Sequence, residues 1–219
     1  MIADPRAVAA RWPEPRRRML CELAAAVTEA PWTLSPGHHL RARDAGLSDD
    51  DVLHAIALSA LFGHLNRIAD AVAVALDYEA PRLPPHAEPA IPPLERAPGA
   101  CRGAPTMTIE ARPATAAALA AWRDHVVTRN PASLRIAGWV AGLLGDGDPV
   151  PVEDTTDGEP ALRELVEQVT LAPWRLGDAS FAPLRALGHD DAAVFDACAA
   201  ASSFGVFSRI RVALTAFGG

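Results

Sequence analysis

The chain has 219 residues and a mass of 23.1 kDa; 50% of its residues are hydrophobic and 21% are charged. This composition is typical of a globular protein and excludes a disordered chain or a coiled coil. All 20 basic residues are arginine, which excludes lysine-dependent chemistry such as Schiff-base catalysis, pyridoxal phosphate attachment and the P-loop. The formal net charge of −7 argues against nucleic acid or an anionic membrane as a partner, because both require a dense basic surface.

The cysteines Cys21, Cys101 and Cys198 lie far apart and form no C-x-x-C pair, so neither a disulfide framework nor a cysteine zinc site is predicted. The first residues lack the order of a signal peptide. The longest apolar run, residues 56–63, is shorter than the roughly 20 residues of a membrane span. We therefore expect a soluble cytoplasmic protein without a cofactor or a bound metal.

Helical periodicity and start and stop signals predict an all-α chain. Ser35-Pro36 starts a short helix that Gly46 ends, and Ser48 with the three following aspartates starts a long one. A short extended piece is predicted at Thr106–Ala111. The predicted helices cover about residues 14–29, 35–46, 48–76, 114–128, 131–144, 160–170, 178–187 and 190–217.

An internal repeat relates the two ends of the chain. The segment Ala30-Pro31-Trp32-Thr33-Leu34 returns as Ala172-Pro173-Trp174-Arg175-Leu176, an offset of 142 residues. The same offset continues without a gap through Gly46/Gly188, Phe62-Gly63/Phe204-Gly205 and Arg67/Arg209. The pattern predicts a duplication. We expect Trp32 and Trp174, at equivalent bends, to be core residues.

A proline-rich segment separates the repeats. Nine prolines between Tyr78 and Pro113 forbid regular helix and favour an extended linker. The predicted organisation is a first helical repeat at residues 1–80, a linker at 81–113, and a second repeat with two preceding helices at 114–219.

The stretch Gly46-Leu-Ser-Asp-Asp-Asp-Val-Leu-His and its continuation Phe62-Gly-His-Leu-Asn-Arg-Ile-Ala-Asp-Ala resemble the AhpD-like superfamily of alkylhydroperoxidase D and carboxymuconolactone decarboxylase. The similarity is greatest to the peroxidase-related branch and covers residues 16–78 well and the second repeat more loosely. It implies two AhpD-like helical repeats packed with pseudo-two-fold symmetry, so that one chain mimics a dimer of the family's smaller unit.

The reactive motif of that family is missing. Its redox members carry C-x-x-C-x-x-x-H, in which a low-pKa cysteine attacks the peroxide and a second cysteine resolves it. The matching positions hold Pro31, Leu34 and His38 in the first repeat, and Pro173, Leu176 and Ser180 in the second. We therefore expect no dithiol-dependent peroxidase turnover.

Histidines cluster in the first repeat, and their equivalents in the second repeat are other residue types. Imidazole titrates near neutral pH, so His38 and His64 are the candidate catalytic residues. Arg67 is the candidate for holding a small carboxylate, with Asn66, His39 and His54 as further ligand-binding candidates. A structural role for the whole set stays open. The predicted pocket lies near His38 and the His64–Arg67 turn, with walls from helix 131–144 or the long helix of repeat 2.

Three functions remain open from the sequence. The first is a small-molecule-binding or structural homologue that has lost the thiol site. The second is an enzyme that uses histidine and arginine in acid–base chemistry on a small organic acid or lactone. The third is residual peroxidase or antioxidant activity through Cys101 or Cys21. The apolar faces of the long helices would also allow a homo-oligomer.

Overall fold

The computed structural model describes residues 12–73, 109–147 and 159–217, and within them the chain is helical, without a β-strand. This confirms the predicted all-α class. The α-helices and the single-turn 3-10 helices η1–η3 are α2 (Pro15–Glu29), η1 (Pro31–Thr33), α3 (Pro36–Asp44), α4 (Asp49–Ala71), η2 (Ile109–Ala111), α5 (Pro113–Arg129), α6 (Ser133–Leu144), α7 (Glu159–Leu171), η3 (Pro173–Arg175), α8 (Asp178–Ala186) and α9 (Asp191–Ala216).

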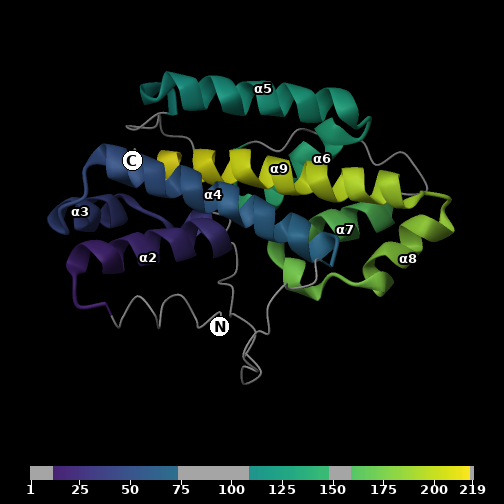
Figure 1. The fold of residues 1–219 in the computed structure, drawn as a ribbon, viewed down its shortest axis with the longest axis horizontal. Helices are drawn as coiled ribbons and strands as arrows, with labels where there is room; N and C mark the ends of the chain where they lie inside the picture. The colour runs from purple at the N-terminus through teal and green to yellow at the C-terminus, as the bar shows by residue number, and fades with distance from the viewer. Residues whose placement is uncertain (1–11, 74–108, 148–158, 218–219) are drawn as a thin grey trace.

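The two long helices, α4 and α9, pack side by side along the centre of the molecule (Figure 1). Helices α2 and α3 adjoin α4, whereas α6, α7 and α8 adjoin α9. Helix α5 lies outside the pair, roughly along the direction of α9, and contacts α9 (Figure 1). Only one residue of α5, Val126, is buried, so this helix lies on the outside of the bundle.

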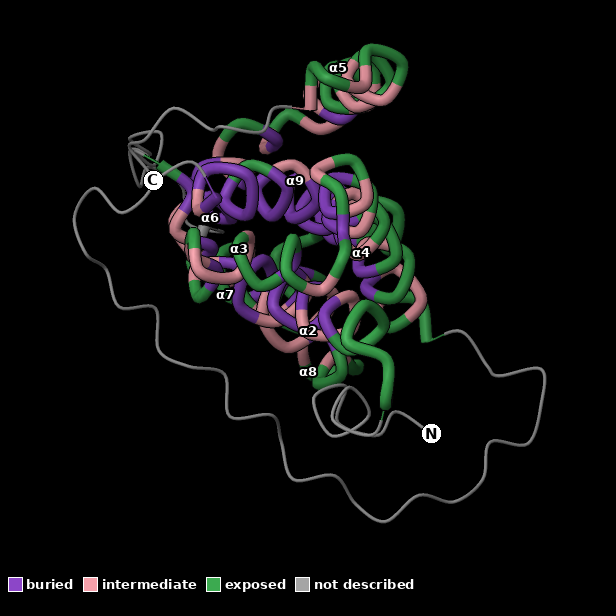
Figure 2. Tube along the Cα trace, turned by 90° about the vertical axis from the view of Figure 1, so that its left-hand side faces the viewer, coloured by how far each residue is buried: buried purple, intermediate pink, exposed green. Residues whose placement is uncertain are grey.

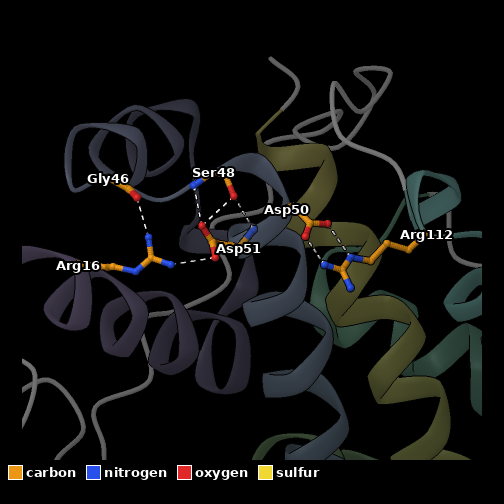
Figure 3. Close-up of polar contacts among 6 residues, drawn as sticks. All are labelled: Arg16, Gly46, Ser48, Asp50, Asp51 and Arg112. Atoms are coloured by element: carbon orange, nitrogen blue, oxygen red, sulfur yellow. Dashed lines mark hydrogen bonds and ion pairs between the residues drawn. The ribbon is translucent and has the colours of Figure 1, made fainter.

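The helix starts follow from short polar motifs. Ser48 accepts a hydrogen bond from the Asp51 amide, and the Asp51 carboxylate accepts from the Ser48 amide, which completes a capping box (Figure 3). Asp190 caps α9 with a single hydrogen bond, which its carboxylate accepts from the Ala193 amide. Gly46 and Gly188, with φ of 82° and 89°, adopt the left-handed conformation that ends the preceding short helices.

The apolar core forms two clusters that share α9. The first joins α2, α3 and the N-terminal half of α4 to Val206, Ile210 and Leu214 of α9. The second joins α6, α7 and α8 to α9 residues such as Val194 and Phe204. Both clusters therefore need α9 for completion.

The 142-residue offset recurs in the coordinates. Helix α8 begins and ends 142 residues after α3, and the first residue of α9 follows that of α4 by the same number. The ion pair between Arg43 and Asp49 has its counterpart in Arg185 and Asp191. Equivalent residues thus start and connect equivalent helices in the two segments.

Three expectations require correction. Residues Ile109–Ala111 form a 3-10 turn, not an extended piece, while residues 106–108 lie outside the described part. Helix α4 ends at Ala71 instead of Leu76, and Ala73 just beyond it has a left-handed φ of 48°. Trp174 has 48% of its surface exposed and is not a core residue, whereas its equivalent Trp32 is half-buried against the second cluster.

By length and composition alone, α4 and α9 are each long and apolar enough to cross a membrane. The core helices of globular proteins pass the same test. In α9, 72% of the most apolar window is buried inside the fold, against 33% in α4. The apolar surface of α9 is thus explained by packing within the chain, and much of that on α4 is not.

Candidate functional site in the cleft between helices α4, α5 and α9

A cleft of about 310 Å³ lies between α5, the C-terminal half of α4 and the N-terminal half of α9. Apolar and polar side chains line it together, as they do in small-molecule sites. The lining residues are His64, Ile68, Trp122, His125, Val126, Arg129, Asn130, Phe195, Asp196, Ala199, Ala200 and Ser203.

His64 is held in one orientation by the neighbouring long helix. The Ser202 hydroxyl donates to the His64 carbonyl at 3.2 Å, and its oxygen lies 2.8 Å from His64 Nδ1. The single hydroxyl proton of Ser202 is used in the bond to the carbonyl. The hydroxyl oxygen can then only accept a hydrogen bond from the ring, so Nδ1 of His64 carries the proton and donates it. This tautomer leaves the lone pair on Nε2, which has no partner among the described residues.

The ring of Trp122 on α5 meets the edge of the His64 ring, with 4.9 Å between centroids, and also contacts Phe207 of α9 at 5.2 Å. This tryptophan anchors α5 over the other two helices. Burial lowers the pKa of His64 below its ordinary 6.5; the Ser202 hydrogen bond, the next largest cause, raises it in part, and the charge of Arg67 lowers it by a smaller amount. His64 is therefore neutral at pH 7.

The charged groups of the cleft come from α5 and α9. His125 and Arg129 are four residues apart, so they share one face of α5. Arg129 is exposed and makes no ion pair with any residue of the described ranges. Asp196 of α9 is half-buried and lacks a cationic partner there as well. Counting only the described residues, the cleft thus offers one arginine and one carboxylate that have no ion-pair partner.

The other predicted histidines lie elsewhere. His38 on α3 is half-buried, and its Nδ1 is 3.0 Å from the Ser35 hydroxyl. His39 pairs through Nε2 with Asp49 at 2.8 Å and stacks on Phe217. His54 is exposed on α4. Only His64 of the four lines the cleft, so the predicted constellation around His38 and His64 does not form.

Asn66 is exposed and does not line the cleft, and Arg67 is buried in the core. The Arg67 guanidinium donates to the carbonyls of Gly63 at 2.7 Å, Thr170 at 3.3 Å and Thr28 at 3.4 Å. A structural role therefore replaces the expected role of Arg67 in holding a ligand carboxylate. We expected one wall of the pocket to come from the long helix of the second repeat, and α9 does line the cleft. The other expected wall, helix 131–144 (α6), does not line it, and α5 does.

A second buried arginine, Arg209, mirrors Arg67. It donates to the carbonyls of Gly205 at 3.2 Å, Thr28 at 3.2 Å and Thr170 at 2.9 Å. Thr28 and Thr170 lie in the last turns of α2 and α7, where carbonyls carry the negative end of the helix dipole. The two guanidinium groups are thus compensated by two helix ends, and the charge of the Asp70 carboxylate also favours protonated Arg67.

Burial lowers the pKa of Arg67 to about 10, and burial together with the charge of Arg67 lowers the pKa of Arg209 well below its ordinary value. Arg67 therefore remains protonated at neutral pH. The two charges repel each other, and the shared carbonyls hold them in place. This centre belongs to the core and takes no part in the cleft.

Thiol chemistry has little support in the described residues. Burial raises the pKa of the Cys198 thiol to about 12, so it carries no reactive thiolate at neutral pH. Cys21 is half-buried, and Cys101 lies outside the described residues. Within the described ranges, no three His, Cys, Asp or Glu side chains converge as metal ligands.

Sequence reasoning missed His125, Arg129 and Asp196. The i, i+4 spacing of His125 and Arg129 on one predicted helix was the available signal for a shared face. This face meets α4 and α9 because of the way α5 packs on them. The spacing of residues along α5 does not predict that packing.

Comparison with protein-family models, curated proteins and solved structures gave no match. The resemblance to the AhpD-like superfamily therefore stands on the sequence motifs alone.

The lowered pKa values of His38 and His64 predict a loss of stability in mild acid. In both histidines burial is the largest cause, so the folded state takes up these protons only below 6.5, where the unfolded chain already binds them. The urea midpoint should therefore fall as the pH drops below about 6.5. His64→Gln should reduce this fall, and His125→Gln, at an exposed position, should leave it unchanged.

A urea midpoint that does not change between about pH 7 and pH 5 would contradict the burial of the neutral rings.

The carboxylates change the stability in a separate, more acidic pH range. Hydrogen bonds from His39 and Arg43 hold the pKa of Asp49 below 3.8, so its contribution is present above that value and is lost only in stronger acid.

Proposed function

We propose that this chain is an AhpD-like protein without a thiol peroxidase site, which binds a small organic acid in the cleft between α4, α5 and α9. The observation that carries the proposal is the convergence of an oriented neutral His64 with the free Arg129 in one partly apolar cleft. Among the described residues, Nε2 of His64 has no hydrogen-bond partner and Arg129 has no ion pair.

The order of the helices supports the family assignment. Each segment runs helix, 3-10 turn, short helix and long helix, and the 3-10 turns, the short helices and the first residues of the long helices match at the 142-residue offset. Arg67 and Arg209 each donate to Thr28 and Thr170, which are themselves 142 residues apart. A pseudo-two-fold axis between the two arginines would produce this exchange of partners, and superposition of residues 31–71 on 173–213 tests it.

The ligand class follows from the charges. An arginine binds a carboxylate through two parallel N–H donors, so Arg129 is the anchor for the acid group. Asp196 accepts hydrogen bonds and favours a ligand that also carries a hydroxyl or an amino group. Val126 and Phe195 supply apolar walls for the carbon chain. A small hydroxy acid or amino acid satisfies all three features.

An acid–base enzyme is the second candidate, and the His64 tautomer favours it. A neutral imidazole with Nε2 unprotonated is a general base near neutral pH. With a carboxylate on Arg129, this nitrogen would take a proton from the carbon or hydroxyl next to the acid group. Residual peroxidase activity is the third candidate; it would need Cys101 or Cys21, and no described contact favours it.

Binding is tested by titrating the protein calorimetrically with a panel of small hydroxy, amino and keto acids. We expect at least one to bind, and Arg129→Gln to weaken that binding by about tenfold or more, the equivalent of one charge-assisted hydrogen bond. Arg123→Gln is the matched control, since Arg123 is an exposed arginine of α5 outside the cleft. Equal loss in both variants, or no binding by any acid, would refute the proposal.

Catalysis is distinguished from binding by following the bound acid in D₂O by proton NMR. Loss of the signal of the hydrogen next to the carboxyl group, abolished by His64→Gln, would establish proton abstraction. Consumption of an organic hydroperoxide with a dithiol, abolished by Cys101→Ser, would instead establish the thiol activity.

A further inference from the structure

One face of α4 is apolar and exposed. Leu58, Leu61, Phe62, Leu65 and Val72 have between 39% and 59% of their surface accessible. The first four lie three or four residues apart, and Val72, the residue that follows α4, comes seven residues (two turns) after Leu65, so all five share one face. Figure 2 shows α4 at the border of the helical body, with exposed segments on its outer side. A contiguous stripe of this kind is unusual on a monomer, although single exposed apolar side chains are common.

The same positions in α9 are covered. Phe62 corresponds to Phe204, which is buried among Ile136 and Trp139 of α6. Val72 corresponds to Leu214, which is also buried. Helix α6 packs along α9, and the described residues provide no such helix for α4. Positions that α9 buries are therefore exposed on α4, and no helix of the described residues covers them.

The charges around the stripe suit a second copy of this chain. Between Asp51 and Asp70 the only charged residue of α4 is Arg67, which is buried. The aspartates at the start of α4 are paired within the chain: Asp49 with Arg43, Asp50 with Arg112 and Asp51 with Arg16 (Figure 3 for the last two). Two copies with a net charge of −7 each would repel elsewhere, but along this face they meet without a charge conflict.

We propose that the α4 stripe is the interface of a two-fold symmetric dimer, in which α4 of one copy packs antiparallel on α4 of the other. A stripe that is uncharged and apolar throughout is complementary to itself, as an isologous interface requires. The antiparallel direction separates the two aspartate-rich helix starts and places each negative helix end beside a positive one. Five partly exposed side chains bury too little surface for an obligate dimer, so the dimer dissociates on dilution.

The test is the mass of the full chain in solution, measured by sedimentation equilibrium over a range of concentrations. The wild type should approach twice 23.1 kDa at high concentration and fall toward 23.1 kDa on dilution. Leu65→Asp should remain at 23.1 kDa throughout. Leu134→Asp is the matched control, because Leu134 is an equally exposed helical leucine, 61% accessible against 52% for Leu65, on α6. This variant should dimerise like the wild type.

Three outcomes would overturn the dimer. The wild type stays monomeric at high concentration, or Leu134→Asp dissociates it as strongly as Leu65→Asp, or the monomeric wild type sediments with neutral phosphatidylcholine vesicles. The last result would assign the stripe to a lipid surface. Circular dichroism of Leu65→Asp should show unchanged helix content, because an exposed position tolerates the carboxylate in the monomer. None of these measurements depends on a ligand in the cleft, so they succeed or fail independently of the proposed function.

Discussion

Replacing Gly205 with alanine should destabilise the fold by about 2–4 kcal/mol, although alanine is the better helix former by about 1 kcal/mol. A Cβ atom at this position would lie 2.8 Å from Nη1 of Arg209. A flexible side chain at the surface would move aside, but the Arg209 guanidinium is enclosed and bonded to three carbonyls. Its displacement leaves a buried cation without its acceptors, and this cost exceeds the gain in helix propensity.

Gly63→Ala should act in the same way, since the new Cβ would lie 2.7 Å from Nη1 of Arg67. Gly37→Ala is the control, because a Cβ there meets the Ser35 hydroxyl at an ordinary 3.6 Å. That variant should be neutral or more stable by up to about 1 kcal/mol. Urea unfolding at neutral pH measures all three variants. Stabilisation by Gly205→Ala would show that the arginine adopts another position at little cost.

The second large effect concerns the two buried arginines together. Arg67→Met and Arg209→Met should each cost about 1–3 kcal/mol, and the double variant should cost more than their sum by at least about 1 kcal/mol. Each single variant leaves the other guanidinium to donate to Thr28 and Thr170. The double variant removes the last side-chain donor from both helix ends.

The repulsion between the two arginines also makes the loss of stability in the double variant larger than the sum of the single losses. Removing either arginine relieves the repulsion between them, and the sum of the single effects counts this relief twice, whereas the double variant gains it once. Shared acceptors and repulsion therefore both make the double loss larger than additive. The free energies of unfolding of the four proteins in urea give the coupling directly. Additive or smaller losses would mean that the two guanidinium groups act independently.

The helices were predictable because their signals are local. The capping serine at Ser48, the proline after Ser35 and the glycines 46 and 188 fix helix ends through contacts within a few residues. Trp174 was misjudged because burial depends on what packs against a bend, and its equivalent Trp32 meets the second cluster while Trp174 does not.

The cleft was predictable only in part, because it is formed by contacts that are distant in sequence. His64 was identified as a candidate, yet its orienting partner Ser202 is 138 residues away. Arg67 was assigned to a ligand because its charge is usually solvated or paired, and nothing local indicated that helix ends from α2 and α7 would enclose it. The docking of α5, which brings Arg129 to the site, is likewise a tertiary property.

The position of α9 in both apolar clusters sets the order in which this chain folds as it leaves the ribosome. Helices α2, α3 and α4 are synthesised long before Val206, Ile210 and Leu214, which complete their cluster. At typical rates of about 5–20 residues per second, they wait on the order of ten seconds with apolar faces open to water. Neither segment forms a finished core during synthesis, so a ribosome stalled before α9 exposes an unfinished bundle rather than a folded first half.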